Sequence, residues 1–291
     1  MRRLTIFTPT YNRAYTLPKL YESLCIQTFH DFEWLIVDDG STDHTRELID
    51  GWIKDGKINI RYIYQENAGK MMAHNMAVKI SDSELFMCAD SDDYLCSAQV
   101  IEGIISFWDV HNKSHNCDIC GIIAFKEIGQ RKMSFPEGMS IAHLSELSER
   151  GFKGEVALVF KCDVLKRYPF PKFPNEKFVT DVYIYDQIDR EYRFLLYPQH
   201  VQHCRYHEDG YSYHYMELLF ANPLGFRAYH NQCVKFRKRG WLKSVICYIA
   251  LSIRVGCRGM LVEAANKKLT ILLFPLGILK YFYDNYRLSQ L

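Results

Sequence analysis

The chain has 291 residues, of which 48% are hydrophobic and 24% charged, and these ordinary values exclude a wholly disordered, collagen-like or coiled-coil protein. At about 150 residues per domain, the length predicts one or two domains. The formal net charge of +2 is too small for a dedicated nucleic-acid-binding protein, so we expect no nucleic-acid partner.

The ten cysteines are scattered and lack the spacing of a secreted disulfide framework. The chain starts with a methionine and two arginines and then enters an apolar run too short for the core of a signal peptide. We therefore expect a cytoplasmic protein with free thiols. An alternative is a zinc site made by His111, His115, Cys117 and Cys120. Residues 118–125, however, have the pattern of a buried strand, in which cysteine acts as a small apolar residue.

Short apolar runs alternate with helical patterns over the first hundred residues, which is typical of βαβ units and a mostly parallel sheet. The predicted strands are residues 3–8, 33–37, 58–64 and 84–88, and the predicted helices are residues 17–28, 42–54 and 70–80. Further strands and a loop are predicted for residues 117–167, and an acidic helix for residues 177–191. Beyond about residue 212 the pattern is helical. We expect an α/β, Rossmann-like sheet flanked by helices, with a C-terminal helical extension.

Polar segments follow each of the first four predicted strands, at residues 8–13, 38–43, 65–70 and 89–93. Ligands of open α/β sheets bind at the carboxyl ends of the strands, so we expect these segments to form one site. Neither G-x-G-x-x-G nor G-x-x-x-x-G-K-[ST] occurs in the chain. A Rossmann dinucleotide site and a P-loop are therefore disfavoured.

Asp90 and Asp92 end the fourth predicted strand, and a divalent cation would relieve the repulsion between their carboxylates. Mg²⁺ or Mn²⁺ would suit, because such ions take carboxylate and diphosphate oxygens. The alternative is that Asp92 or Asp93 caps the following helix. Lys70 begins a predicted helix, where its charge can meet phosphate or sugar oxygens.

One acid of the pair Asp38 and Asp39 can accept hydrogen bonds from a base or a ribose, as the acid after a Rossmann strand does. Gly40 permits a tight turn after this pair, and Ser41 or Thr42 can cap the next helix. Tyr11 can offer a ring for a base to stack on, or it can simply pack against the fold. The four segments thus combine groups suited to a nucleotide.

In order and spacing, four segments resemble the inverting family-2 glycosyltransferases with the glycosyltransferase-A fold. They are Thr8-Pro9-Thr10-Tyr11-Asn12-Arg13, Val37-Asp38-Asp39-Gly40-Ser41-Thr42-Asp43, Asn67-Ala68-Gly69-Lys70 with Asn75, and Asp90-Ser91-Asp92-Asp93. The resemblance extends over residues 3–210. It implies a catalytic domain at residues 1–211, with a nucleotide-sugar-binding half at 1–97 and an acceptor-binding half at 98–211.

The resemblance also implies roles for single residues. Thr8, Pro9 and Tyr11 would line the nucleobase pocket. Asp39 would bind the base, and Asp38 would support Asp39. Asn67 and Lys70 would lie near the donor, and Asp90 would contact ribose or sugar. Asp92 would ligate Mn²⁺ or Mg²⁺ through the D-x-D motif of the family.

On the acceptor side, the family has an acidic pair whose second member acts as general base. Thr180 and Asp181 fall where this pair would be, so the resemblance assigns the base to Asp181, although Thr180 replaces the usual first acid. Glu176 is the reserve candidate, and helical periodicity would turn Asp186 away from Asp181. Alternatively, Asp181 is an acid favoured by the positive end of a helix dipole.

A second polar cluster, His200, His203 and His207 with Glu208-Asp209-Gly210, precedes the C-terminal part of the chain. The resemblance implies that His207 is a metal or diphosphate contact. The alternative is that all three histidines are surface residues beside a strand.

The basic charge is concentrated near the C-terminus. Residues 235–291 contain 11 Lys or Arg and 2 Asp or Glu, a balance of +9, whereas the rest of the chain contains 25 and 32. Apolar runs alternate with these charges, so residues 212–291 are predicted to form a basic helical tail. This tail would contact an anionic lipid surface or cap the domain. Its longest apolar stretch, residues 269–283, is shorter than the roughly 20 residues that span a bilayer.

The resemblance implies an inverting transfer of sugar from a nucleotide-diphosphate donor, expected to be a UDP-sugar, to a hydroxyl of a glycan or lipid-linked acceptor. The expected setting is cell-surface polysaccharide synthesis at the inner face of the membrane. A nucleotidyltransferase would need a glycine-rich loop after the first strand, and residues 9–13 contain no glycine. A non-catalytic nucleotide-sugar-binding scaffold protein remains the alternative, supported by Thr180.

Overall fold

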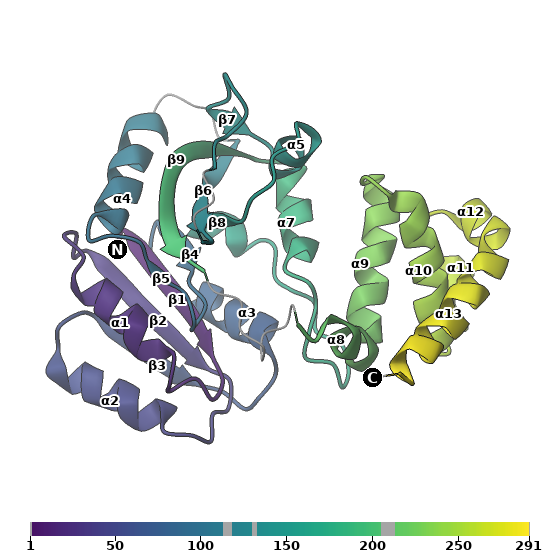
Figure 1. Cartoon of the computed structure of the whole chain (residues 1–291), viewed down its shortest axis with the longest axis horizontal. Coiled ribbons are helices and arrows are strands. Elements are labelled where there is room, and N and C mark those ends of the chain that lie inside the picture. The colour runs from purple at the N-terminus through teal and green to yellow at the C-terminus, as the bar shows by residue number, and fades with distance from the viewer. Residues whose placement is uncertain (1, 113–117, 130–132, 205–212, 291) are drawn as a thin grey trace. The chain divides into compact units, whose positions relative to one another are not determined.

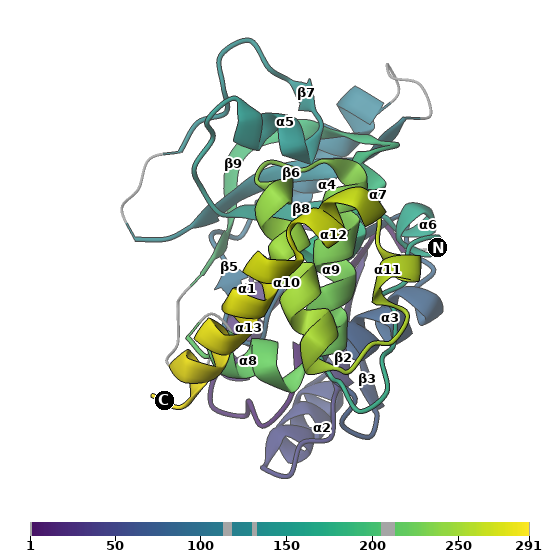
Figure 2. The same ribbon diagram turned by 90° about the vertical axis from the view of Figure 1, so that its right-hand side faces the viewer.

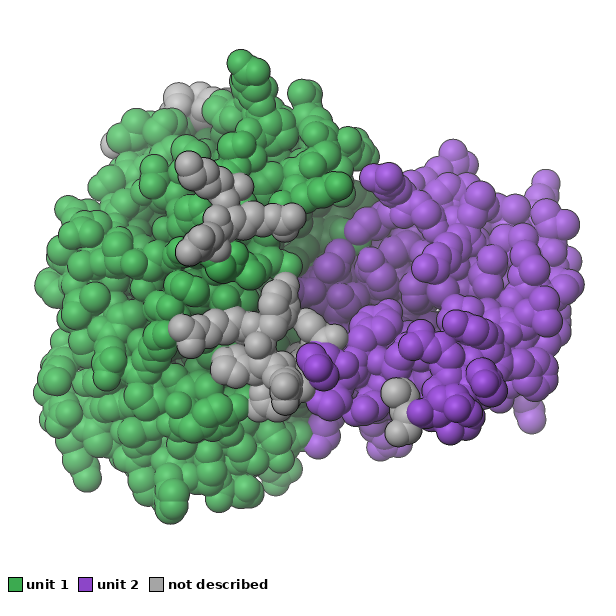
Figure 3. Space-filling model, viewed as in Figure 1, with its two compact units in different colours: residues 1–169, 184–205 green, residues 170–183, 206–291 purple. Residues whose placement is uncertain are grey.

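The computed structural model describes residues 2–112, 118–129, 133–204 and 213–290 (Figure 1). The chain divides into two compact units (Figure 3). The first, the sheet unit, contains residues 1–169 and 184–205, and the second, the helical unit, contains residues 170–183 and 206–291. Residues 170–183 therefore belong with the C-terminal helices, although the sequence around them belongs with the sheet.

The first four predicted strands are confirmed and pair in parallel. They are β1 (Leu4–Thr10), β2 (Phe32–Asp38), β3 (Ile60–Tyr64) and β4 (Leu85–Cys88), in the order β3-β2-β1-β4. The helices between them, α1 (Leu17–Cys25), α2 (Thr45–Asp55) and α3 (Lys70–Ile80), are also confirmed. Both β1 and β2 are buried along their whole length, as expected for parallel strands covered by helices on both faces.

Two of these helices are shorter than predicted because side chains take up the backbone groups at their ends. The Asn12 side-chain oxygen accepts hydrogen bonds from the amides of Thr42 and Asp43, and the Asp43 carboxylate accepts one from the amide of Thr45, where α2 begins. At the end of α1, the Gln27 side chain donates to the carbonyl of Ser23. Local polar contacts of this kind end a helix that the apolar periodicity alone would extend.

The later strands make the sheet mixed. They are β5 (Tyr94–Leu95), β6 (Ile119–Glu127), β7 (Ile141–Ala142), β8 (Val156–Lys161) and β9 (Arg193–His203). The order continues as β4-β8-β6-β9-β5, with β7 also paired to β9. β8 is antiparallel to both β4 and β6, whereas β6 and β9 are parallel. The predicted α/β class is thus confirmed, and the parallel part is concentrated in the first four strands.

The remaining helices of the sheet unit are α4 (Val100–His111), α5 (Leu144–Glu149), α6 (Cys162–Leu165) and most of α7 (Val182–Asp189). α1, α2 and α4 bury their apolar residues against one face of the sheet, in the same cluster as Ile6 and Trp34. On the other face, His74 of α3 contacts the Phe7 and Phe86 rings edge-on. Burial lowers the pKa of the His74 imidazole to about 3, so this ring is neutral near neutral pH.

The predicted acidic helix begins later than expected, at Val182. The Glu176 carboxylate accepts hydrogen bonds from two amides in the first turn of α9 (Pro223–Phe236), at 2.6 and 2.8 Å. The Asn222 side chain accepts hydrogen bonds from the amides of Lys177 and Phe178, at 2.9 and 3.0 Å. Residues 176–178 are therefore held against the start of α9, and their backbone groups are not available to an extended α7.

The helical unit confirms the helical pattern predicted beyond residue 212. Its helices are α8 (Tyr215–Ala221), α9, α10 (Trp241–Arg254), α11 (Met260–Glu263), α12 (Lys267–Leu272) and α13 (Phe274–Leu288) (Figure 2). α10 packs against α9 and α13, and it contributes the buried side chains of Val245, Tyr248 and Ile249. A Cβ atom at Gly277 of α13 would lie 2.2 Å from Ile249 Cγ2, so glycine allows α13 to approach α10 closely.

Across the residues that the structure describes, every helix is too short or too polar to cross a membrane. The cysteines of this part of the chain are all free thiols, as expected. Cys120 is buried in β6, which confirms the strand predicted there, and its thiol donates to the carbonyl of Arg193. No group of three potential metal-binding side chains occurs in this part, and the zinc candidates His115 and Cys117 lie outside the described residues.

Gly121 of β6 provides a test of the pairing between β6 and β8. A Cβ atom there would lie 2.0 Å from the Val159 carbonyl oxygen of β8, a backbone atom held by strand pairing. We expect Gly121→Ala to lower the free energy of unfolding by about 1–3 kcal/mol or more. Gly51→Ala in α2, where nothing lies within 4 Å, is the control and should be neutral or raise it by up to about 1 kcal/mol. Urea unfolding measures both, and equal midpoints would contradict this packing.

Candidate active site

The loop after β2 is held by the buried carboxylate of Asp38, which is 1% exposed. One of its oxygens accepts a hydrogen bond from the amide of Ser41 and the other from the Tyr62 hydroxyl, both at 2.7 Å. Gly40 adopts a φ of +90°, and a Cβ atom there would lie 3.0 Å from the amide nitrogen of Asn67. Asp38 and Gly40 together fix a tight turn, and Tyr62 is a supporting residue that the sequence did not reveal.

Asp39 joins the loop after β2 to the loop after β3. Its Oδ1 atom accepts hydrogen bonds from the Gln65 side chain at 2.7 Å and from the amide of Ala68 at 2.8 Å, and its Oδ2 atom accepts one from the amide of Gly69 at 2.8 Å. The Asn67 side chain donates to the Asp39 carbonyl at 2.8 Å. A carboxylate offers about four acceptor positions, so one more bond can still be accepted. Asp39 therefore sets the position at which α3 begins.

Lys70, the first residue of α3, reaches the loop after β4. Its Nζ atom lies 2.6 Å from Oδ1 of Asp90. Burial alone would raise the pKa of the Asp90 carboxyl, but the positive charges of Lys70 and Lys126 outweigh this effect and lower the pKa to about 2. Asp90 is therefore ionised at neutral pH. The segments after β2, β3 and β4 are connected in this way, through Asp39 and then through Lys70.

A second ion pair holds the Asp90–Asp93 turn. Asp93 is 2% exposed, and one of its carboxylate oxygens lies 2.9 Å from Nζ of Lys126, on β6. Its amide donates to the Asp90 carbonyl at 3.0 Å. The hypothesis that Asp92 or Asp93 caps the following helix is wrong, because α4 begins at Val100 with Gln99 as its N-cap residue. Sequence reasoning missed Lys126, whose only signal is a single cation after the apolar run of β6.

Asp92 lies in the same turn and is partly exposed, between the buried residues Ser91 and Asp93. Asp90 and Asp92 supply the hard oxygen donors that Mg²⁺ and Mn²⁺ prefer. These ions usually take one or two carboxylates together with substrate phosphates, so the donor set of this turn fits such an ion. The other predicted metal residue, His207, lies outside the described residues, whereas His200 and His203 lie on β9.

The residues predicted at the end of β1 differ in exposure. Thr8 is fully buried, and its hydroxyl accepts a hydrogen bond from Nε1 of Trp34 at 2.9 Å. Pro9 is also buried in β1, whereas the Tyr11 side chain is 49% exposed. The amide of Asn12 donates to the Ser41 hydroxyl at 2.8 Å, which joins this loop to the one after β2. Of Thr8, Pro9 and Tyr11, Tyr11 is thus the one whose side chain is exposed. Asn12 connects the loops after β1 and β2, a role that the sequence did not reveal.

Asp181 belongs to the helical unit and directly precedes α7. It is exposed, and its Oδ1 atom accepts a hydrogen bond from the amide of Val182 at 2.8 Å. Glu176, the reserve candidate, is committed to the start of α9 through both carboxylate oxygens, and burial raises its pKa despite those hydrogen bonds. Asp186 is half-buried within α7. Asp181 is therefore the exposed carboxylate of the three.

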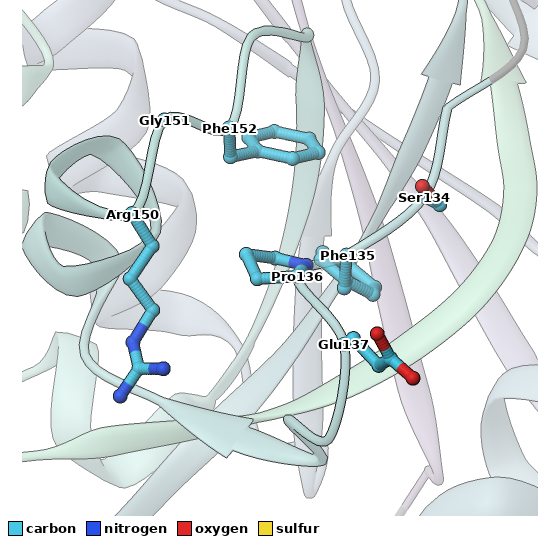
Figure 4. A pocket seen from close by; sticks show the side chains of 7 residues that line it. All are labelled: Ser134, Phe135, Pro136, Glu137, Arg150, Gly151 and Phe152. Carbon is cyan, nitrogen blue, oxygen red and sulfur yellow. The ribbon is translucent and has the colours of Figure 1, made fainter.

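A separate hollow of 480 Å³ lies in the sheet unit (Figure 4). It is lined by Ser134, Phe135, Pro136, Glu137, Arg150, Gly151 and Phe152. The Phe135 and Phe152 ring centroids are 5.7 Å apart, and Figure 4 shows the Arg150 side chain at the left and the Glu137 side chain at the lower right. Because none of the loop residues described above lines this hollow, we assign it no part in the site.

The arrangement of carboxylates and a lysine at the carboxyl ends of parallel strands is that of a nucleotide-binding α/β protein. Residues 5–169 match the family model described as Glycosyl transferase family 2. The chain belongs to this family, whose members are transferase enzymes. The family and the glycosyltransferase-A fold predicted from the sequence are thereby confirmed.

Individual relatives agree with this classification. The chain is 41% identical to a teichoic acid poly(glycerol phosphate) polymerase of Staphylococcus epidermidis over 98 residues, which are 33% of the chain and 14% of that protein. Across five curated relatives, the chain covers only 14–30% of their length.

Two solved structures share the fold. Residues 1–349 of S. aureus TarS have a TM-score of 0.62 at 17% identity, with coverage of 99% of this chain and 91% of that one. TarS is a poly(ribitol-phosphate) beta-N-acetylglucosaminyltransferase and has also been solved in complex with UDP-GlcNAc. The mannosyltransferase PcManGT of Pyrobaculum calidifontis, in complex with GDP-Man and Mn²⁺, has a TM-score of 0.57 at 17% identity and coverage of 99% and 83%.

Removing the cation beside Asp93 tests the role of Lys126. Lys126→Met leaves a buried carboxylate unpaired, so we expect the free energy of unfolding to fall by about 3–5 kcal/mol. The double change Lys126→Met with Asp93→Leu should restore most of this loss, because the carboxylate that Lys126 pairs with is removed as well. Lys166→Met, at an exposed position, is the control, and its free energy of unfolding should stay within about 0.5 kcal/mol of the parent value. Urea unfolding measures all three, and a Lys126→Met protein as stable as the parent would contradict the assignment.

Proposed function

We propose that this chain is an inverting glycosyltransferase that moves a sugar from a nucleotide-diphosphate donor, a UDP-sugar, to a hydroxyl of a glycan or lipid-linked acceptor. The observation that carries the proposal is the connection of the loops after β2, β3 and β4 through Asp39 and the Lys70–Asp90 ion pair. This connection places a cation and two carboxylates at one edge of the sheet. A diphosphate needs such a combination, because its charge must be balanced by a lysine and a metal ion.

In this proposal the exposed ring of Tyr11 stacks on the base, and the remaining acceptor position of Asp39 receives a hydrogen bond from it. Asn67 lies beside Asp39 and contacts the donor. Thr8, Pro9 and Asp38, which are buried, support these residues from within the fold. Asp90 accepts hydrogen bonds from ribose or sugar, and its low pKa keeps it ionised for this role. Lys70 faces the diphosphate, where its ammonium group attracts the leaving group.

Asp92 would hold Mn²⁺ or Mg²⁺, with His207 as a further ligand. When bound, the ion supplies positive charge that stabilises the departing diphosphate. The Asp181 carboxylate takes the proton of the acceptor hydroxyl as general base. The hydroxyl oxygen then forms a bond to the anomeric carbon, on the face opposite the bond that breaks. That bond's electron pair leaves with the nucleoside diphosphate, and the single displacement inverts the configuration.

Cell-surface polysaccharide synthesis is the setting we propose, because the named relatives include a teichoic acid polymerase and a poly(ribitol-phosphate) glycosyltransferase. The tail at residues 212–291 is proposed to bring the chain to an anionic membrane surface. A scaffold that binds a nucleotide sugar without turnover is the second candidate, since Thr180 stands where the family has its first acid. The two proposals differ in turnover and agree in donor binding.

Thermal unfolding with nucleotides tests the donor site. We expect UDP with Mn²⁺ to raise the melting temperature, because a ligand at 100 times its Kd adds about 2.7 kcal/mol of stability. GDP, CDP and dTDP should give smaller shifts. Asp92→Asn should abolish the Mn²⁺-dependent part of the shift, whereas Asp82→Asn, an exposed acid before β4, should not. Absence of a shift with any nucleotide would contradict the proposed donor site.

Turnover tests the general base. Asp181→Asn should reduce sugar transfer by about 10²–10⁴-fold while UDP binding stays unchanged, because proton transfer is lost and the donor loops are untouched. Asp186→Asn is the matched control on the neighbouring helix and should retain activity. Transfer at the parent rate in Asp181→Asn would rule out this base. Donor binding without transfer in the parent chain, across a panel of glycan and lipid-linked acceptors, would favour the scaffold.

A further inference from the structure

One face of α13 is apolar and exposed. Leu276, Leu279, Phe282, Tyr283 and Tyr286 follow one another at helical spacing, and their side chains are 46–64% exposed. The opposite face of the helix carries Gly277 and Asp284, which are both buried. α13 has 15 residues, so this face is about 22 Å long at 1.5 Å per residue. A face of this length is too extended to be explained as single scattered apolar residues.

The neighbouring helix α12 continues this exposed apolar character. Ile271 and Leu272 are 62% and 71% exposed, and α13 begins two residues after Leu272. In Figure 2, α12 and α13 lie on the same side of the helical unit. We call the exposed side chains of both helices the α12–α13 stripe: Ile271, Leu272, Leu276, Leu279, Phe282, Tyr283 and Tyr286.

Positive charges lie at both ends of the stripe. Lys267 and Lys268 are exposed at the start of α12, one turn before Ile271 and Leu272, and Arg287 is exposed in the last turn of α13. The 2 acids among residues 235–291 are both used in ion pairs. Glu263 pairs with Arg227 at 2.8 Å, and the buried Asp284 pairs with Lys280. The basic residues of this segment therefore exceed its acids by 9, and neither acid is paired with Lys267, Lys268 or Arg287.

We propose that the α12–α13 stripe binds the anionic surface of a lipid bilayer, with α13 lying in the plane of the interface. Helices that lie in the interface combine an apolar face rich in leucine and aromatic residues with basic residues on their polar flanks. Tyrosine is favoured there, because its ring enters the apolar boundary while its hydroxyl stays in water. The lysines and Arg287 would meet the acidic headgroups.

The charge pattern favours lipid over a second copy of the chain as the occupant. Two copies meeting through the stripe would bring the exposed cations Lys267, Lys268 and Arg287 of both copies into one interface, and like charges across an interface oppose association. An anionic bilayer complements both the apolar side chains and the cations. The inference does not depend on the transferase activity, since it uses only the helical unit.

Vesicle co-sedimentation of the 291-residue chain tests the inference. We expect binding to vesicles of equal parts phosphatidylglycerol and phosphatidylcholine, weaker binding to phosphatidylcholine alone, and a decrease with added salt. The double change Leu279→Ser and Phe282→Ser should lower the partition coefficient by about tenfold or more, because two apolar side chains that would enter the bilayer are lost. The control pair, Val110→Ser and Ile53→Ser, removes exposed apolar side chains from α4 and α2 and should bind as the parent does.

Tryptophan fluorescence gives a second measurement that does not rely on a loss of binding. Leu279→Trp should show a blue-shifted emission with phosphatidylglycerol vesicles and quenching by brominated lipid, and Val110→Trp should show neither. Equal binding of the two serine pairs, or equal emission of the two tryptophan variants, would overturn the proposal. So would a dimer in light scattering that Leu279→Ser with Phe282→Ser converts to monomer while the parent ignores both vesicles.

Discussion

The carboxylate of Asp39 is the contact on which the organisation of the site depends. Its three hydrogen bonds hold residues 65–69 and thereby fix where α3 starts. The start of α3 determines how far Lys70 extends toward Asp90. Lys126 of β6 holds the Asp90–Asp93 turn from the other side of the sequence, through its ion pair with Asp93. Each of these contacts joins segments far apart in the chain. Loss of the first would release the next, so the charged groups at this edge of the sheet form one connected system.

The fold was largely predictable where one local pattern determines the structure. The first four strands and α3 follow directly from apolar runs and a helical period, because tertiary contacts agree there with local preference. The prediction failed at the start of α7, where Glu176 is bound to α9 through amides nearly fifty positions later in the chain. No window of local sequence contains such a long-range hydrogen bond. The end of α1 and the start of α2 were misplaced for the related reason that side chains bond to backbone groups there, a carbonyl in α1 and amides before α2.

The sequence allowed the charged residues of the candidate site to be predicted. It did not allow the residues that hold them in place to be predicted. Asp39, Lys70 and Asp90 were selected because they follow strands, and the structure brings them together. Lys126, Tyr62 and Asn12 were missed, since their importance arises from partners on other strands and loops. Thr8 adds a further point: the resemblance implies that it lines the nucleobase pocket, and the structure shows that its hydroxyl accepts a hydrogen bond from Trp34 inside the fold. A motif gives the residues of a site, and burial separates those that face a ligand from those that support it.

The sheet has an asymmetry whose consequence reaches beyond the site. Four parallel strands, joined by short helical connections, are followed by β8, which runs antiparallel between β4 and β6. The donor residues proposed here all come from the parallel part. In the antiparallel part, Gly121 allows β6 to approach β8 closely, and Lys126 of β6 supports the Asp90–Asp93 turn. Insertions and exchanges in the loops that leave the antiparallel part therefore need not disturb the parallel part. For the transferase proposed above, such a scaffold would allow acceptor recognition to diversify in evolution while the groups proposed to hold the nucleotide are inherited intact.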